Sequence, residues 1–249
     1  MIMSSYHIFA QFYDALTQNV DYGVRSAYLS DLFSQAGKPT GTVLDLACGT
    51  GETARYLTEK GYRVIGLDLS ADMLTVATAK GIPDLTLLCA DMTDFALPEP
   101  VDACCCTLDS LNHLPDLSAV KRCFQCVAEA LVPDGVFIFD VNTVYKHREV
   151  LADNAFIFDQ DGYFLAWDNE LLDERRVRIL LDFFVENGAH YDRFSEELTE
   201  TAYTVGELTA ALSDRFDVLG VYEELSDRPP QPDSERIYFV CKRKKEWER

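Results

Sequence analysis

The sequence predicts an α/β fold built around a doubly wound, mostly parallel sheet. In the first part of the chain, short and nearly continuous apolar runs alternate with segments of helical length. This alternation is typical of parallel strands that are covered by helices on both faces. A glycine-rich turn joins the first apolar run to the helix that follows it. Beyond about residue 150 the apolar residues recur with a period of two, which indicates antiparallel strands.

The predicted elements follow one another in regular order up to residue 141. Ser70 is expected to cap the helix that follows it, and Gly81 and Pro83 are expected to end that helix. The predicted helices cover residues 3–36, 52–60, 71–80 and 117–131, and the predicted strands cover residues 42–47, 62–67, 85–89, 101–108 and 136–141. In such sheets ligands bind beyond the carboxyl ends of the strands, so a site is expected there.

The second half of the chain predicts an insert and the end of the main sheet. Residues 155–198 alternate with period two and contain the hairpin signal Asn187-Gly188, which predicts three or four antiparallel strands. Thr204 and Glu207 fit a capping box that opens a helix to about Ser213. Two last strands are expected over residues 216–222 and 236–242. The whole is a Rossmann-like, seven-stranded, mostly parallel sheet with an antiparallel β insert after strand five.

Charge and cysteine usage exclude several classes of function. The chain has 22 Lys and Arg residues against 42 Asp and Glu residues, a net charge of −20, which argues against a nucleic-acid partner. No apolar run approaches the ~20 residues that span a bilayer, and no export signal is recognised, so we expect no membrane association and a cytoplasmic location. The consecutive Cys104, Cys105 and Cys106 suit a buried strand in a reducing compartment. Cys123 and Cys126 fall within a predicted helix, and no metal site is expected.

The strongest chemical signal is the sequence VLDLACGTG over residues 43–51. Gly49 and Gly51 allow positive φ and a close approach of a ligand to the backbone. The spacing Gly49-x-Gly51-x-x-Ala54 also matches a dinucleotide fingerprint, so the glycines alone do not identify the ligand. Asp45 distinguishes the alternatives, because a carboxylate at this strand end repels a pyrophosphate and attracts an ammonium group.

Two further acids follow the next two strands. Asp68 ends the second strand, where it can accept hydrogen bonds from ribose hydroxyls, and Asp91 ends the third, where it can bind the exocyclic amine of adenine beside Met92. Each acid alone has a structural alternative: Asp45 and Asp91 as helix caps, and Asp68 as a turn residue. The three acids together predict one ligand that carries an amino group, a ribose and an adenine.

These motifs resemble those of class I S-adenosylmethionine-dependent methyltransferases. Residues 43–51 are similar to motif I of the family, Asp68 to its ribose-binding acid, Asp91-Met92 to its adenine motif, and residues 101–114 (VDACCCTLDSLNHL) to its fourth-strand motif. The resemblance covers about residues 40–142. The segments around Tyr13 and over residues 237–242 are similar to bacterial small-molecule methyltransferases that carry a β-rich insert.

The resemblance implies S-adenosyl-L-methionine as cofactor and S-adenosyl-L-homocysteine as product. Residues 1–144 and 203–249 would form the cofactor-binding domain with a helical N-terminal cap, and residues 145–202 the insert that serves as lid and substrate element. The implied cofactor-binding residues are Tyr13, Tyr22, Asp45, Ala47, Cys48, Gly49, Gly51, Asp68, Leu69, Met73, Asp91, Met92, Leu108 and Asp109. Asp140 and Asn142 would border the acceptor.

Transfer of a methyl group from a sulfonium depends on aligning the nucleophile, the methyl carbon and the sulfur more than on acid–base catalysis, because the sulfonium is already a good leaving group. An acceptor hydroxyl or acidic carbon would require a base, whereas an amine must only be neutral. The candidates for a base are His113, Asp140, His190 and Tyr203. For His190 and Tyr203, a surface or packing role is the competing interpretation.

The sequence therefore predicts a methyltransferase that acts on a small-molecule acceptor by in-line displacement. Two alternatives remain at this point: a non-catalytic S-adenosylmethionine-binding protein, and an NAD-type oxidoreductase of the same topology, which Asp45 opposes. A homodimer is left open as an assembly. The acceptor and its nucleophilic atom are not predicted.

Overall fold

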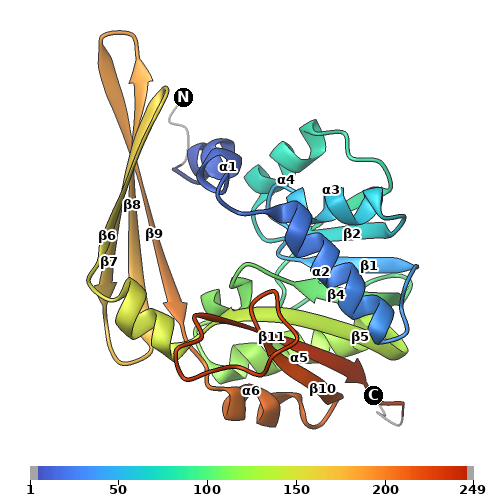
Figure 1. The fold of residues 1–249 in the computed structure, drawn as a ribbon. Coiled ribbons are helices and arrows are strands. Elements are labelled where there is room, and N and C mark those ends of the chain that lie inside the picture. Colours follow the sequence, from blue (N-terminus) through green and yellow to red (C-terminus); the bar gives the residue numbers. More distant parts are fainter. Residues whose placement is uncertain (1–4, 246–249) are drawn as a thin grey trace.

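The computed structural model describes residues 5–245 and contains two sheets (Figure 1). The larger sheet has seven strands in the order β10-β11-β5-β4-β1-β2-β3, and the smaller has four in the order β6-β7-β8-β9. Strands β1 to β5 of the larger sheet pair in parallel, and β11 is antiparallel to both β5 and β10. This arrangement confirms the predicted mostly parallel, seven-stranded sheet with an antiparallel insert.

The elements of the larger sheet agree closely with the predicted ranges. Its strands are β1 (Thr42–Leu46), β2 (Arg63–Asp68), β3 (Leu85–Cys89), β4 (Val101–Cys106), β5 (Leu131–Asn142), β10 (Phe216–Glu223) and β11 (Arg236–Arg243). The helices that cover it are α2 (Tyr22–Gln35), α3 (Glu52–Glu59), α4 (Ala71–Ala79), α5 (Leu117–Ala130) and α6 (Val205–Leu212). Strand β5 starts before the predicted residue 136, because Leu131 already pairs with Val101 of β4 and an irregularity follows.

The N-terminal segment was predicted as helical over residues 3–36, of which residues 3–4 lie outside the described residues. It forms two helices, α1 (Ser5–Leu16) and α2, separated by a turn. Asp21 caps the second helix, since its side chain accepts a hydrogen bond from the Val24 backbone N–H at 2.9 Å. The break lets α1 leave the face covered by α2 and lie beside the smaller sheet (Figure 1).

Apolar side chains fill both faces of the larger sheet. On β4, Cys104 and Cys106 pack on the side of α5, whereas Ala103 and Cys105 pack on the side of α2. The consecutive cysteines are buried in one strand, as predicted, and their side chains alternate between its two faces; all three are free thiols. Within residues 5–245 no helix has both the length and the apolar character that crossing a membrane requires.

The insert is a four-stranded antiparallel sheet. It consists of β6 (Ala155–Gln160), β7 (Tyr163–Leu171), β8 (Arg176–Asn187) and β9 (His190–Thr201). The predicted hairpin at Asn187-Gly188 joins β8 to β9. One face of the sheet packs against α1, where the rings of Phe12 and Phe183 lie 6.3 Å apart. After the insert, the predicted capping box of Thr204 and Glu207 opens α6 with both of its hydrogen bonds formed.

Candidate active site

A cavity of about 960 Å³ lies beyond the carboxyl ends of β1, β2, β3 and β4. Its walls include Ala47, Asp68, Asp91 and Leu108, each at the end of one of these strands or just after it. Residues of α1 and β9 form the walls opposite the sheet. The volume lies at the upper end of the range for small-molecule sites, so it has room for a nucleoside-sized cofactor and a second small molecule.

The turn after β1 brings its backbone to the cavity. Ala47 and Gly49 both have positive φ, 59° and 54°. A Cβ at Gly49 would lie 3.9 Å from the Tyr13 ring, so this glycine leaves open space beneath that ring. Gly51 is required for packing instead, because a Cβ at this position would lie 3.2 Å from the Ile82 side chain. Gly51 therefore packs against the protein interior, and the cavity walls described do not include it.

Asp45 is a buried carboxylate with one unsatisfied oxygen. It is 2% exposed, its Oδ1 is 3.5 Å from the Cys105 thiol, and its Oδ2 has no hydrogen-bond partner among the described residues. Burial raises its pKa to about 7, against the opposing effects of the Cys105 thiol and of the Ala54 backbone N–H in the first turn of α3. Gly51, not Asp45, is the N-cap residue of α3. The unsatisfied oxygen is suited to a positively charged ligand.

A small hollow of about 30 Å³ opens beside Asp45. Tyr13, Tyr22 and Cys48 line it together with that carboxylate. It has room for a single group of the size of water or ammonium. Burial raises the pKa of Tyr22 to about 12, and burial likewise raises that of Tyr13 well above its usual range. Both phenols therefore stay protonated and can donate hydrogen bonds into this space.

Asp68 organises two turns of the cavity wall. Its Oδ2 accepts from the Gly49 backbone N–H and its Oδ1 from that of Ser70, each at 2.8 Å. Burial raises the pKa of Asp68, and the two backbone hydrogen bonds oppose that shift. Ser70 caps α4, as predicted, because its Oγ accepts from the Met73 backbone N–H at 3.2 Å.

The segment after β3 supplies an acid and an apolar surface. Asp91 Oδ1 accepts hydrogen bonds from the backbone N–H and the hydroxyl of Thr93, so Asp91 stabilises a turn and does not cap a helix. Met92, Leu69 and Met73 join Asp91 in the cavity wall. Leu69 is 71% exposed, which leaves an apolar surface open toward the cavity.

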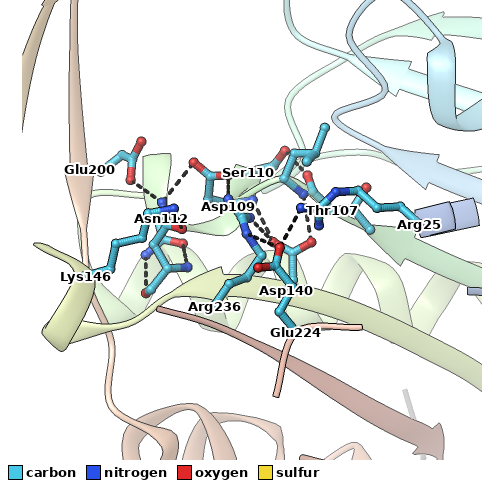
Figure 2. A network of polar contacts seen from close by, with 12 residues as sticks. Arg25, Thr107, Asp109, Ser110, Asn112, Asp140, Lys146, Glu200, Glu224 and Arg236 are labelled. Carbon is cyan, nitrogen blue, oxygen red and sulfur yellow. Dashed lines mark hydrogen bonds and ion pairs between the residues drawn. The ribbon is translucent and has the colours of Figure 1, made fainter. Parts of the chain in front are cut away.

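The turn after β4 is held by a buried charge network (Figure 2). Leu108 and Asp109 both have positive φ. Their backbone N–H groups donate to the two oxygens of Asp140, at 2.9 and 2.8 Å. Arg236 reaches from β11 and forms ion pairs with Asp140, with Asp109 at 2.7 Å and with Glu224 at 3.3 Å. The network fixes the strained turn that presents Leu108 to the cavity.

Asp109 itself points into this network, although it was predicted to contact the cofactor. Its oxygens accept from Arg236 and from Asn142 Nδ2 at 3.0 Å, and the described cavity walls do not include it. Burial raises its pKa, but the charges of Arg236 and Lys146 outweigh burial and hold the pKa well below its usual range. Asp109 is thus a permanent anion that supports the turn.

The candidate bases have very different surroundings. Asp140 is completely buried, and backbone N–H groups and Arg236 occupy its oxygens. Tyr203 is 4% exposed and donates its hydroxyl hydrogen to the Leu114 carbonyl, while burial raises its pKa to about 12. His190 is exposed at the start of β9, outside the described cavity walls. His113 alone of the four lines the cavity, at the end of the short 3₁₀ turn η1 (Ser110–His113).

Helix α1 forms a wall of the cavity opposite the large sheet. Phe9 and Tyr13 stand four residues apart on it and both line the cavity. Asp14 anchors the helix to the sheet side, because it accepts from Thr50 Oγ1 and pairs with Lys80 at 2.6 Å. The spacing of the aromatic residues in the sequence is the signal that could have predicted Phe9.

The insert was predicted as a lid and substrate element, but none of its motifs identified the residues of β9 that line the cavity. Glu197, Leu198 and Thr199 line the cavity, far along the chain from the strand-end motifs. Asn142, expected at the acceptor, instead donates to Glu200 at 3.0 Å and accepts from Lys146 at 3.1 Å. The alternation of β9 indicates that these residues lie on a strand, but only the fold decides which edge of the sheet meets the cavity.

Known proteins share this arrangement. The family model described as "Methyltransferase domain" matches residues 43–135. YqeM of Bacillus subtilis, whose name assigns it to the methyltransferases, is 33% identical over 96% of this chain and 98% of the relative. The crystal structure of an S-adenosylmethionine-dependent methyltransferase from Clostridium acetobutylicum is similar with 33% identity and a TM-score of 0.84, over 95% of this chain and 98% of that one.

The chain belongs to the S-adenosylmethionine-dependent methyltransferases. Its cofactor is S-adenosyl-L-methionine. Its cavity lies beyond the carboxyl ends of the strands, where doubly wound sheets bind their ligands. The prediction of a class I methyltransferase is thereby confirmed over the NAD-type oxidoreductase. A dTDP-3-amino-3,4,6-trideoxy-alpha-D-glucopyranose N,N-dimethyltransferase from Streptomyces venezuelae is a further relative, 32% identical over 80% of this chain and 84% of the relative.

Proposed function

We propose that this methyltransferase transfers the methyl group to the nitrogen atom of a small-molecule amine bound in the 960 Å³ cavity. The observation that carries the proposal is that this one cavity joins the strand-end acids to His113 and to β9. The Streptomyces venezuelae relative, named as an N,N-dimethyltransferase of an amino sugar, supports nitrogen as the accepting atom. Cytoplasmic location remains a proposal that rests on the cysteine usage.

The residues around the cavity fit S-adenosylmethionine. The unsatisfied Oδ2 of Asp45 beside the small hollow suits the ammonium group of the methionine part. Asp68, at the end of β2, would hold the ribose hydroxyls. Asp91 would accept from the adenine amine while Met92 and Leu69 cover the ring. We propose that the predicted cofactor-binding residues contact S-adenosylmethionine, except for Gly51 and Asp109, whose contacts lie elsewhere.

When bound, S-adenosylmethionine supplies an electrophilic methyl group: the lone pair of the acceptor nitrogen forms the new bond to carbon while the carbon–sulfur bond breaks toward sulfur. The chain's own part is to align the acceptor and to manage its proton. Tyr13 stays neutral and can donate a hydrogen bond across the cavity. His113 is the residue that we assign to receive a proton from the amine. Asp140 holds the backbone of the turn after β4, and Tyr203 donates to the Leu114 carbonyl, so we assign neither of them as a base.

The insert would act as lid and substrate element. We propose this role for residues 145–202, with residues 1–144 and 203–249 as the cofactor-binding domain. The support is that β9 contributes cavity walls and that the insert packs on α1, which covers the cavity. Assembly into a homodimer remains a prediction.

Transfer of a labelled methyl group from S-adenosylmethionine into a fractionated metabolite pool tests the proposal. Wild-type protein is expected to label a small amine. His113→Asn is expected to keep cofactor affinity within about threefold and to lose at least about tenfold in rate. His190→Asn, which changes the exposed histidine of β9, is the matched control and should retain the wild-type rate. A wild-type protein that labels no small molecule would overturn the proposal.

A further inference from the structure

A buried asparagine ties the large sheet to both ends of the insert. Asn112, in η1, is completely buried. Its amide nitrogen donates to the Asn142 carbonyl at 3.1 Å and to the Thr201 carbonyl at 3.0 Å, and its amide oxygen accepts from the Asn142 backbone N–H at 2.9 Å. Asn142 ends β5 just before the insert, and Thr201 ends β9. These two positions form the neck of the insert, and Asn112 holds them together.

A second set of buried bonds continues from the neck into β9 (Figure 2). Asn142 divides the two hydrogens of its side-chain amide between Asp109 and Glu200, each at 3.0 Å. Glu200 is 4% exposed, and its Oε2 also lies 3.2 Å from His147 Nε2. The other ring nitrogen of His147 donates to the Arg175 carbonyl at 2.9 Å, because a carbonyl oxygen can only accept. Loss of any partner would leave a polar group buried and unsatisfied.

The two ends of this network lie next to different walls of the cavity. Asn112 immediately precedes His113, which lines the cavity from η1. Glu200 lies two residues after Leu198, which lines the cavity from β9. The register of β9 with β8 puts Leu198 and Glu200 on the face that carries Ile179, and this face packs toward α1. A shift at either end of the network would therefore move a wall of the cavity.

The network joins η1 to β9 and so sets the spacing between these two walls. We propose that Asn112 and Glu200 are positioning residues of the acceptor site, which hold His113 at the distance from β9 that the amine requires. Neither residue is among the described cavity walls, so each acts through a neighbour. Misplacement of a reacting group by about 1 Å can lower a rate about 100-fold. The inference rests on the proposed function and adds to it two residues outside the cavity.

Kinetics of substitutions at Glu200 test the β9 end of the network. The acceptor is the amine fraction that the wild-type protein labels in the metabolite pool. Glu200→Leu is expected to raise the KM for this fraction at least about tenfold. S-adenosylmethionine affinity should stay within about threefold, because Asp68 and Asp140 hold the turns on the cofactor side. Glu200→Gln retains an oxygen that can accept from Asn142, so its KM should lie between the wild-type value and that of Glu200→Leu.

Asn169→Leu is the matched control. Asn169 is 3% exposed, and its side chain bonds to Trp167 and to the Asn154 carbonyl, each at 2.8 Å and within the insert. This variant also loses a buried polar group, but it should keep the wild-type KM per folded protein. Equal KM values for Glu200→Leu and Asn169→Leu would overturn the positioning role. If Glu200→Leu does not fold, a wild-type KM in Glu200→Gln would overturn it.

Asn112→Ser tests the η1 end of the network. It truncates the amide that forms the three bonds, so kcat should fall at least about tenfold with KM changed less than about threefold, because η1 carries His113. Added to His113→Asn, it should cause no further loss, since it acts through that histidine. A further loss of the same size in the double variant would overturn the inference and leave the proposed function standing. A wild-type protein that labels no amine would overturn the proposed function itself.

Discussion

The rim of the large sheet and the insert use polar residues in contrasting ways. At the rim, carboxylates bind backbone N–H groups: Asp68 holds two turns and Asp140 holds a third. On the outer face of the insert, side chains pair with side chains at the surface, as in Arg193 with Asp182. Surface pairs contribute only about 0–1 kcal/mol, whereas buried bonds to a charged group contribute about 1.5–3 kcal/mol. The rim therefore fixes a geometry, and the insert can change its surface charges without losing its fold.

The largest expected effect on cofactor affinity comes from a pair of glycine substitutions at positive φ, one in each region. Gly49→Val and Gly188→Val both put a branched side chain at positive φ, +54° and +63°. Each should lose about 1–3 kcal/mol of stability, measured by urea unfolding. Only Gly49→Val fills the space beneath Tyr13, so it should lower S-adenosylmethionine affinity at least about 100-fold, or about 2.7 kcal/mol. Equal S-adenosylmethionine affinities of the two variants would contradict the proposal that the rim, and not the hairpin of the insert, binds the cofactor.

A core substitution in the insert should also reach the rim through α1. Phe183 is fully buried and its ring packs against Phe9 and Phe12. Phe183→Ala should cost about 3–5 kcal/mol in the free energy of unfolding and weaken cofactor binding, because the helix that carries Tyr13 loses its support. Phe164→Ala, on the half-buried opposite face of β7, is the control and should leave cofactor affinity unchanged. Unchanged cofactor affinity in Phe183→Ala would show that the core of the insert does not support the cofactor site at the rim.

The buried carboxylate of β1 makes cofactor binding depend on pH. Because burial raises the pKa of Asp45 to about 7, its anionic form, which attracts ammonium, is lost as pH falls through that value. Calorimetric titrations between about pH 5.5 and 7.5 should show affinity that rises with pH. Asp45→Asn should bind more weakly, with affinity independent of pH in that window. In the free protein the raised pKa has the opposite consequence: stability falls as pH rises from about 4 to about 7, and Asp45→Asn removes this loss.

The smallest effect is expected at a helix cap outside both regions. Thr204→Ala removes the hydroxyl that accepts from the Glu207 backbone N–H at 3.2 Å. The free energy of unfolding should fall by about 1 kcal/mol, and Thr204→Ser should restore it. Methyl-transfer rates of both variants should equal the wild-type rate. A changed rate would mean that α6 takes part in the site.

The fold and the cofactor side of the site followed from local sequence signals. Apolar runs, capping residues and the Asn187-Gly188 turn each depend on a few neighbouring residues, and the structure has the corresponding strands, helices and hairpin. Asp68 and Asp91 line one cavity and Asp45 lines the small hollow, all beyond the same edge of the sheet, because parallel strands end at that edge. The break between α1 and α2 was missed because the aromatic pattern continued past the Asp21 cap.

The acceptor side depends on contacts between distant segments. Asp109 looked like a site residue because it follows β4, yet Arg236 and Asn142 turn it into the buried network. Glu197 had no recognisable motif, and only the packing of the insert beside the rim brings it to the cavity. A pattern of alternation defines the faces of a strand but not the neighbour that each face or edge meets.

Calorimetric titration of S-adenosylmethionine into wild-type protein and Asp68→Ala tests the central claim most directly. That claim is that acids at successive strand ends hold the cofactor in one cavity. Asp68→Ala is expected to bind about 10- to 150-fold more weakly, the equivalent of about 1.5–3 kcal/mol, and neither protein should bind NAD. Equal affinities of the two proteins, or tight binding of NAD, would contradict the account.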